Sequence, residues 1–160
     1  MPLRLYNTLS AKIEALTPQP GRPLGIYACG PTVYDYGHIG NFRTFLHVDI
    51  LRRFLELLGI PLRHVMNITD VDDKIMARAA AAGQSIGDYT AKYEAAFLED
   101  LNALNIEQPE FLARATEHIP QMVALIDKLI ERGSAYRGEN VSYYFRIASF
   151  PEYGKLSKKD

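Results

Sequence analysis

The sequence has few cysteines and no long apolar run, which disulfide-stabilised and membrane-spanning proteins require. Its 160 residues contain one cysteine, Cys29, so a scaffold of intramolecular disulfides is excluded and a reducing compartment is the default. The apolar stretches are interrupted by Arg, Asp or Glu within about ten residues, whereas a membrane span needs roughly 20. The N-terminus has no signal-peptide pattern. We therefore expect a cytoplasmic protein with no membrane partner.

An excess of charge of either sign is also missing. Lys and Arg number 18 against 19 Asp and Glu, which gives a formal net charge of −1. Composition alone thus gives no nucleic-acid footprint, and an RNA partner has to be argued from motifs. Hydrophobic residues make up 48% and charged residues 23% of the chain, as in globular proteins. The length allows one domain, or one and the beginning of another.

The hydrophobic pattern predicts alternating strands and helices. Residues 24–29 form a short apolar run that ends at Gly30-Pro31, and apolar residues then recur at three- and four-residue steps over 38–58, which indicates a helix. Residues 62–68 predict a second strand, and Thr69 or Asp70 is expected to cap a helix that ends near Ala82. Because a strand–helix–strand unit places its strands in parallel, the fold class is α/β, the first half of a Rossmann-type domain.

The second part of the chain has a different pattern. Ser85 is expected to open a third helix, and a fourth is predicted over 116–132. Residues 135–137 and 141–147 flank Gly138-Glu139-Asn140 and predict a hairpin. We therefore assign 1–116 to the first half of a Rossmann-type domain and 117–160 to the beginning of an inserted helix–hairpin region.

In an open parallel sheet, ligands bind beyond the carboxyl ends of the strands. The turn after the first strand leads to His38-Ile39-Gly40-Asn41 at a helix N-terminus, where backbone N–H groups and the helix dipole favour a phosphate. Gly40 would let a ligand approach the backbone, and His38 and Asn41 could donate hydrogen bonds to it. The alternative is that His38 and Asn41 only cap the helix.

Other side chains at the strand ends leave two interpretations open. Cys29 is either a small buried hydrophobe or a zinc ligand, and none of His38, His47, His64 and His118 completes a metal-binding pattern with it. The acidic cluster at the second helix is expected to be mainly a helix cap, and nothing in its spacing demands magnesium; its members are Asp70, Asp72 and Asp73. Three tyrosines either line a pocket or fill a core; they are Tyr27, Tyr34 and Tyr36.

Two of these segments resemble the signatures of cysteinyl-tRNA synthetases, which are class I enzymes. They are Tyr27-Ala28-Cys29-Gly30-Pro31-Thr32-Val33-Tyr34-Asp35-Tyr36-Gly37-His38-Ile39-Gly40-Asn41 and Asn67-Ile68-Thr69-Asp70-Val71-Asp72-Asp73-Lys74-Ile75. Leu5-Tyr6-Asn7-Thr8-Leu9 and Arg114-Ala115-Thr116-Glu117-His118-Ile119 resemble further parts of the family. The resemblance covers essentially the whole chain, as an N-terminal portion of the family's longer sequence.

The resemblance implies roles for individual residues. His38 to Asn41 stand at the family's "HIGH" motif, with Asn41 in place of the second histidine, and His38 and Asn41 would be catalytic. Thr32, His38, Gly40 and Asn41 would bind ATP and the adenylate. Cys29, Gly30 and Thr69 would bind cysteine, with Cys29 as a zinc ligand whose three companions lie outside this chain.

The implied reaction activates L-cysteine with ATP and Mg²⁺ and transfers the cysteinyl group to tRNA(Cys). Zinc would select the thiol, since shape alone separates cysteine from serine poorly. No Lys-Met-Ser-Lys-Ser loop occurs in the sequence, and we expect the 160 residues alone to be inactive. The longer enzyme is expected to be a monomer.

Two alternatives stay open. One is a related ligase that joins cysteine to an amino sugar, and the other is a short, non-catalytic protein that binds a nucleotide or a partner. The enzymatic interpretations require that Cys29 and His38 share one cleft.

Overall fold

The structure is a computed structural model and describes residues 3–158. The chain divides into two compact units, which we call the sheet unit (residues 18–118) and the hairpin unit (residues 1–17 with 119–160). The compact units therefore separate after residues 17 and 118. The functional division that we expect, 1–116 and 117–160, stays a prediction.

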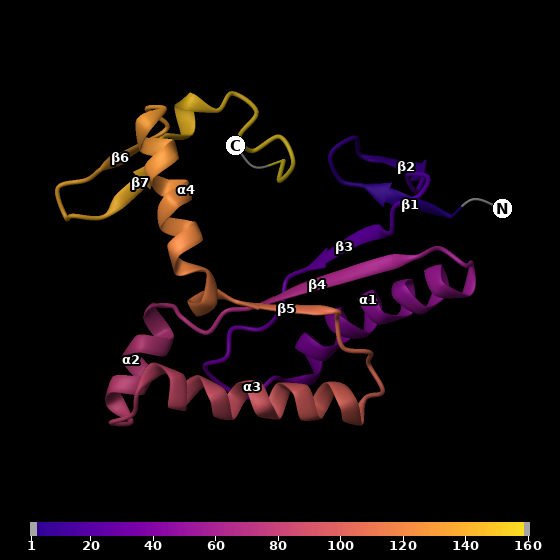
Figure 1. The fold of residues 1–160 in the computed structure, drawn as a ribbon, viewed down its shortest axis with the longest axis horizontal. Coiled ribbons are helices and arrows are strands. Elements are labelled where there is room, and N and C mark those ends of the chain that lie inside the picture. The colour runs from indigo at the N-terminus through magenta and orange to yellow at the C-terminus, as the bar shows by residue number, and fades with distance from the viewer. Residues whose placement is uncertain (1–2, 159–160) are drawn as a thin grey trace. The chain divides into compact units, whose positions relative to one another are not determined.

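The sheet unit is built on three parallel strands, β3 (Leu24–Ala28), β4 (Leu62–Ile68) and β5 (Phe111–Arg114), with β4 in the centre (Figure 1). The helix α1 (Ile39–Leu57) joins β3 to β4, while α2 (Asp73–Ala81) and α3 (Ile86–Ala103) lie between β4 and β5 in sequence. Ile26 pairs with His64, and Asn67 pairs with Ala113. The predicted parallel α/β architecture is confirmed, and β5 is an additional strand.

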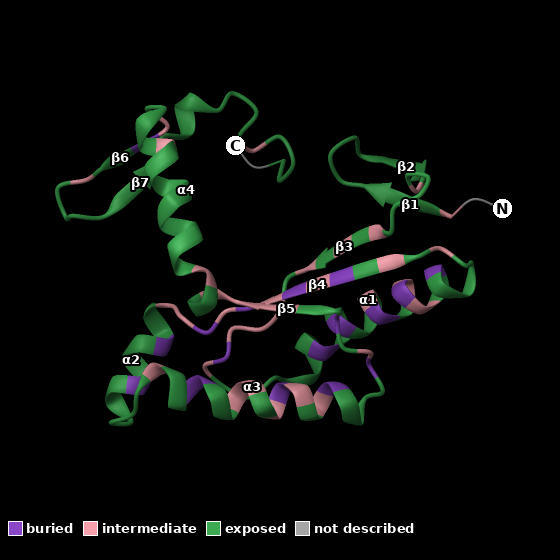
Figure 2. Ribbon diagram, in the orientation of Figure 1, coloured by how far each residue is buried: buried purple, intermediate pink, exposed green. Residues whose placement is uncertain are grey.

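One face of this sheet packs against α1 and α3, which both lie on the same side of it (Figure 1). Along β4 every second side chain is buried, as the alternating colours of that strand show (Figure 2). Three phenylalanines bridge the helices, with ring centroids 5.1 Å apart for Phe45 and Phe97 and 5.9 Å apart for Phe42 and Phe97. Each such buried ring contributes roughly 1.5–3 kcal/mol through the apolar area removed from water. The core comprises Val33, Phe42, Phe45, Met66, Ile68, Phe97, Leu101 and Ile106.

The buried face of α1 is not the apolar stripe that the sequence shows. Ile50 is 58% exposed and Leu57 82% exposed, whereas Asp49 and Arg52 are buried. Only Phe42 is buried among the six apolar residues at helical spacing, which are Ile39, Phe42, Leu46, Ile50, Phe54 and Leu57. The inner face is Phe42, Phe45, Asp49, Arg52 and Leu55.

Paired charges account for the burial of two polar residues on α1. Asp49 accepts hydrogen bonds from Arg53 Nε (2.8 Å) and from the backbone N–H of Glu107 (2.9 Å). Arg52 Nη1 donates to the carbonyl of Gln108 (3.0 Å), and the guanidinium also pairs with Glu110. A buried charge is tolerated when it is paired and hydrogen-bonded in this way. The network ties α1 to the segment that precedes β5.

His64 lies buried beside this network, and neither of its ring nitrogens has a hydrogen-bond partner. Burial lowers the pKa of His64 below its ordinary value of 6.5, and the nearby charge of Arg52 lowers it further, against smaller opposing effects of Glu110 and Asp49. The folded protein therefore holds this imidazole neutral at a pH where the unfolded chain takes up a proton.

We predict that the sheet unit loses stability as the pH falls through about 6.5, by at most about 1.4 kcal/mol per pH unit for this one group. The loss stops once the pH is below the folded-state pKa. Denaturant unfolding of the chain between pH 7.5 and 5 would measure it. His64→Leu should reduce the slope, whereas the exposed His47→Gln should leave it unchanged; equal slopes in all three proteins would contradict the prediction.

The hairpin unit contains two antiparallel pairs, β1 (Arg4–Asn7) with β2 (Lys12–Ala15) and β6 (Ala135–Arg137) with β7 (Tyr143–Phe145). It also contains α4 (Ile119–Glu131) and a 3₁₀ turn over Ile147–Ser149. The predicted hairpin is confirmed. The predicted start of the fourth helix at 116 was wrong, because a 3₁₀ turn over Ala115–His118 precedes α4.

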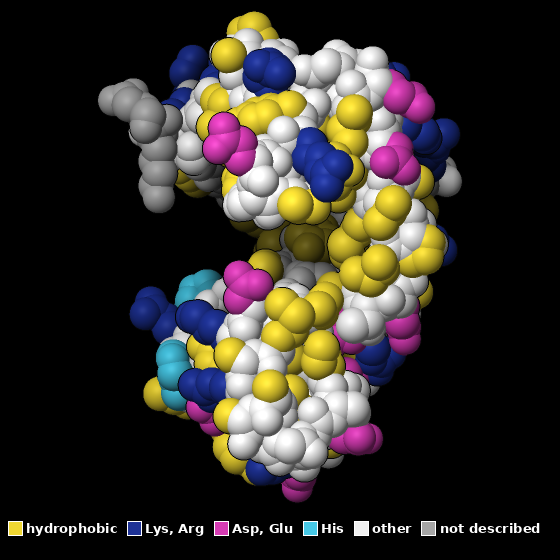
Figure 3. All heavy atoms as spheres, turned by 90° about the vertical axis from the view of Figure 1, so that its left-hand side faces the viewer, with side chains coloured by type: hydrophobic (Ala, Val, Ile, Leu, Met, Phe, Trp, Pro, Cys, Tyr) yellow, Lys and Arg dark blue, Asp and Glu magenta, His cyan; other side chains and the backbone are white. Residues whose placement is uncertain are grey.

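Many large apolar side chains are exposed in both units, and Figure 3 shows hydrophobic groups on the surface among charges of both signs. In the hairpin unit they include Val123, Leu125 and Tyr143, each more than half exposed. Over residues 3–158, no helix is both long and apolar enough to cross a membrane.

Candidate functional site

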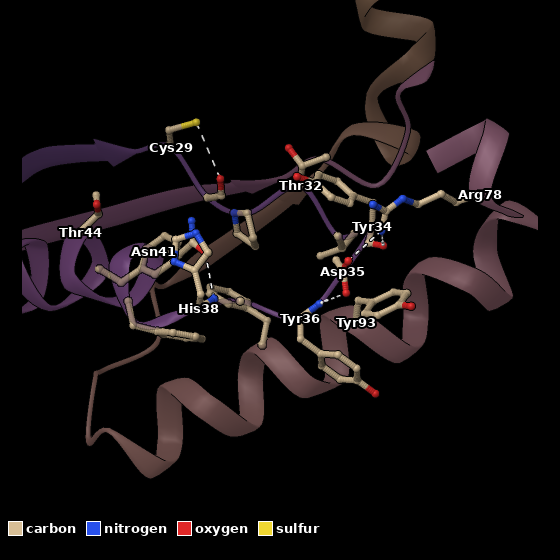
Figure 4. Close-up of a pocket in the computed structure, with 17 residues that line it drawn as sticks. Cys29, Thr32, Tyr34, Asp35, Tyr36, His38, Asn41, Thr44, Arg78 and Tyr93 are labelled. Atoms are coloured by element: carbon tan, nitrogen blue, oxygen red, sulfur yellow. Dashed lines mark hydrogen bonds and ion pairs between the residues drawn. The ribbon is translucent and has the colours of Figure 1, made fainter. Parts of the chain in front are cut away.

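A cavity of about 580 Å³ opens at the carboxyl end of β3 (Figure 4). Its wall is formed mainly by the segment 29–38 between β3 and α1, which we call the pocket loop, together with the first two turns of α1. Arg78 from α2 and Tyr93 and Phe97 from α3 complete it. Cys29 and His38 both line this one cavity, as the enzymatic interpretations require.

The carboxyl ends of β3 and β4 are joined by Asn67. Its Oδ1 accepts hydrogen bonds from the backbone N–H of Gly30 and from the Tyr27 hydroxyl, both at 3.0 Å, and its Nδ2 donates to Thr69 Oγ1 at 3.0 Å. Only glycine fits at position 30, because a Cβ there would lie 1.8 Å from the Asn67 carbonyl oxygen. A bridge between Thr32 and Thr69 extends the parallel pairing beyond the strands. Asn67 thereby holds Thr69, which does not line the cavity, near Gly30, which does.

His38 is the N-cap of α1 and forms a reciprocal pair with Asn41. The imidazole Nδ1 accepts from the backbone N–H of Gly40 (3.1 Å), and Asn41 Oδ1 accepts from the backbone N–H of His38 (3.0 Å). Gly40 packs closely on the ring, since a Cβ there would meet His38 Nδ1 at 3.0 Å. Capping therefore occurs, and it does not exclude a second role, because both side chains also face the cavity.

This arrangement decides which donors remain for an anion. The N–H groups of Gly40 and Asn41 are already paired with His38, so the backbone donors that we expected for a phosphate are partly used. Because Nδ1 accepts, a neutral His38 carries its proton on Nε2. At this helix start the side-chain donors left are His38 Nε2 and Asn41 Nδ2, supported by the positive end of the α1 dipole.

Cys29 is exposed, which excludes its interpretation as a buried hydrophobe. Its Sγ is 3.8 Å from the carbonyl oxygen of Gly30, a weak contact that leaves the thiol accessible. Within residues 3–158 no group of three His, Cys, Asp or Glu side chains could hold a metal ion. The described residues therefore do not form a zinc site by themselves.

The acidic cluster has divided roles. Asp72, not Thr69 or Asp70, caps α2, and its Oδ1 accepts from the backbone N–H of Ile75 at 2.7 Å. The expected cap was wrong because Thr69 still pairs with the pocket loop and Asp70 is buried, with both its oxygens accepting from Thr116. Asp73 lies in the first turn of α2, where its negative charge interacts favourably with the helix dipole.

The three tyrosines also differ. Tyr34 and Tyr36 line the cavity, whereas Tyr27 is 69% exposed. Arg78 donates to Asp35 Oδ2 at 2.8 Å, and this hydrogen bond is the main cause that lowers the pKa of Asp35. Arg78, Tyr93 and Asn67 were not among the predicted site residues. Asn67 carried a signal, because it directly precedes the end of a predicted strand, but Arg78 lies within a helix and carried none.

A family model, tRNA synthetases class I (C) catalytic domain, matches residues 16–160. The chain belongs to the cysteinyl-tRNA synthetase family. It is 61% identical over 160 residues to the cysteine–tRNA ligase of Koribacter versatilis and 51% identical over 158 residues to that of Chlamydia pneumoniae. The alignments include 100% and 99% of this chain but 32% and 33% of those relatives, so the chain spans about a third of their length.

A solved structure shares the fold. Methionyl-tRNA synthetase of Mycobacterium tuberculosis, in complex with methionyl-adenylate, superposes with a TM-score of 0.61 at 22% identity. The match includes 71% of this chain and 23% of that one. At this identity the likeness establishes the class I synthetase fold and confirms the expected Rossmann-type architecture.

Proposed function

We propose that the cavity is the cysteine-activating site of a cysteine–tRNA ligase, which forms cysteinyl-adenylate from L-cysteine and ATP and transfers the cysteinyl group to tRNA(Cys). The observation that carries this proposal is the shared cavity, because Cys29 and the His38–Asn41 pair line the same space. The names of the relatives favour this reaction over the ligase that acts on an amino sugar.

In the proposed reaction, the carboxylate of cysteine attacks the α-phosphorus of ATP and pyrophosphate leaves. His38 Nε2–H and Asn41 Nδ2–H donate hydrogen bonds to phosphate oxygens, where negative charge grows in the transition state. Neither donor carries a formal charge when His38 is neutral, so the positive end of α1 supplies the remaining electrostatic stabilisation. ATP enters with Mg²⁺, and Thr32 contacts it from the pocket loop. Gly40 contributes by holding the His38 ring, because its N–H donates to Nδ1 of that ring.

The amino acid is proposed to lie at the strand ends, beside Cys29, Gly30 and Thr69. Gly30 lines the cavity and lies close against the end of β4, because its N–H donates to Asn67 and it has no side chain to clash there. Thr69 is oriented by Asn67 through the hydrogen bond at 3.0 Å. We also propose that Cys29 is one ligand of a zinc ion whose other ligands come from outside residues 3–158. Such an ion would bond the thiolate of cysteine, for which the hydroxyl of serine is a poor substitute.

The experiment is cysteine-dependent ATP–pyrophosphate exchange by the protein expressed from its complete gene, followed by charging of tRNA(Cys). Exchange with cysteine, none with serine, and transfer to tRNA but not to an amino sugar are the expected results. A protein that binds ATP without exchange would favour the non-catalytic alternative. Activity of residues 1–160 alone would contradict our expectation that they are inactive. Cytoplasmic location and a monomeric state stay predictions.

The zinc proposal gives a separate prediction. In the protein expressed from its complete gene, Cys29→Ser should lower the bound zinc well below one equivalent, because a hydroxyl replaces a thiolate ligand. Metal content by elemental analysis measures this without any assay of activity. As a control, the exposed Ser10→Ala lies in the turn between β1 and β2 and should retain the metal. Unchanged zinc in Cys29→Ser would contradict the role of this thiol.

A further inference from the structure

The first half of the pocket loop is held by backbone hydrogen bonds to the end of β4. The backbone N–H of Val33 donates to the Thr69 carbonyl (3.1 Å), and the N–H of Thr69 donates to the Pro31 carbonyl (2.9 Å), so this half continues the pairing of β3 with β4. Beyond Val33 the loop leaves the sheet, and four residues remain before His38 begins α1. Contacts that hold residues 34–37 in place therefore also determine the position of His38, which follows them and is proposed to bind the phosphates.

Arg78 contacts the backbone, a carboxylate and a ring of this second half, while Tyr36 packs on Tyr93 of α3 with ring centroids 5.1 Å apart (Figure 4). Arg78 Nη1 donates to the Tyr34 carbonyl at 3.1 Å and to Asp35 Oδ2 at 2.8 Å, and its guanidinium carbon lies 4.7 Å from the centre of the Tyr34 ring. Tyr89 of α3 donates to the same carbonyl at 3.0 Å. Asp35 Oδ1 in turn accepts from the backbone N–H of Tyr36 at 2.9 Å, so the side chain that Arg78 holds also shapes the next residue.

We propose that Arg78 is a positioning residue for adenylate formation, because it joins α2 to the second half of the pocket loop and so sets where His38 lies. This inference rests on the proposed function. The helix that carries Arg78 is held in place near the end of β4, since Asp72 caps α2 four residues after Ile68 and the helix buries Ile75 and Ala79. Arg78 thus connects the end of β4, where the cysteine site is proposed, to the start of α1, where the phosphates are proposed to bind.

The exposure of the pair argues against a role in overall stability. The side chains of Arg78 and Asp35 are 46% and 52% exposed, and exposed ion pairs contribute little to the free energy of unfolding. Loss of Arg78 should therefore free the loop without unfolding the protein. Because a misplacement of about 1 Å can reduce a rate by roughly 100-fold, a small local change suffices to affect catalysis.

The chemistry of arginine matters at this position. One planar guanidinium serves a carbonyl, a carboxylate and an aromatic ring at the same time, whereas lysine offers a flexible point charge. Arg78→Lys is therefore expected to retain the pairing with Asp35 and part of the activity. Arg78→Gln should lose both.

The test uses the protein expressed from its complete gene and measures ATP–pyrophosphate exchange with cysteine. Arg78→Gln should lower kcat about 10- to 100-fold with KM for ATP within about threefold, and Arg78→Lys should recover part of the loss. Adding Asp35→Asn to Arg78→Gln should cause little further loss, because the two act through one contact. The matched control is Arg132→Gln, since Arg132 is exposed in the hairpin unit and its side chain makes no hydrogen bond within the described chain.

Hydrogen exchange at the backbone of residues 34–37 gives a readout that does not depend on activity. Faster exchange there in Arg78→Gln, with an unchanged melting temperature, supports the proposal. A raised KM with unchanged kcat would show that Arg78 binds ATP directly and would overturn it, as would wild-type kinetics or additive losses with Asp35→Asn. If the wild type shows no cysteine-dependent exchange, the proposed function fails first, and the positioning role falls with it.

Discussion

Gly30→Ala is expected to destabilise the sheet unit by about 3 kcal/mol or more and to lower its melting temperature by about 12 °C or more. The added Cβ would lie 1.8 Å from the carbonyl oxygen of Asn67 and 2.8 Å from Cγ of Met66. The first of these atoms belongs to the backbone of β4, so no rotation of a side chain relieves the clash. β3 and β4 must separate at the end that carries the proposed cysteine site.

Thermal unfolding followed by circular dichroism measures the effect. Gly25→Ala is the matched control, because it makes the same change within β3, five residues before Gly30, and a Cβ at position 25 meets nothing within 4 Å. The control should unfold within a few degrees of the wild type. If the two variants have the same melting temperature, the close packing of β3 on β4 at Gly30 is wrong.

His38→Asn is expected to separate the two roles of the imidazole. Asparagine is a good N-cap residue, so the variant should lose little of the roughly 1 kcal/mol that a cap contributes. It cannot place an Nε2–H donor at the same point of the cavity. The rate of cysteine-dependent ATP–pyrophosphate exchange should fall about 100- to 1,000-fold, which is the usual cost of losing one donor to a transition-state oxyanion.

The comparison with His38→Ala completes this prediction. The alanine variant should lose the same activity and, in addition, the stability of the cap. If His38→Asn retains wild-type exchange while His38→Ala does not, His38 acts only as a cap. In that case the donors to the phosphates must come from elsewhere in the cavity.

Local sequence signals predicted the parts of this fold that depend on local interactions. Gly30-Pro31 and Pro61 bound the strands, and Ser85 caps α3 as expected, with its Oγ accepting from the backbone N–H of Asp88. The strand β5 had no such signal, because Phe111–Arg114 is short, does not alternate and is held by pairing with β4. The hairpin of β1 and β2, over residues 4–15, was likewise not predicted. Only its residues 5–9 were noted, because they resemble a part of the family's sequence.

The orientation of α1 could not be predicted from periodicity. Its apolar stripe is mostly exposed, while Asp49 and Arg52 are buried because residues 107–110, far along the chain, supply their partners. The candidate site shows the same limit. Cys29 and Gly30 follow a strand end and His38 and Asn41 stand at a helix start, so local signals marked them as candidates. Arg78 reaches the pocket loop only through tertiary packing. The catalytic and binding roles of these residues stay predictions.

A crystal structure of the protein, expressed from its complete gene and bound to a sulfamoyl analogue of cysteinyl-adenylate, tests the central claim most directly. The account predicts that the analogue occupies the cavity of the pocket loop, with its cysteine side chain toward Cys29. Its sulfamoyl oxygens should lie within about 3.2 Å of His38 Nε2. An analogue bound elsewhere, or in the cavity with no contact to His38 and its thiol remote from Cys29, would contradict the account.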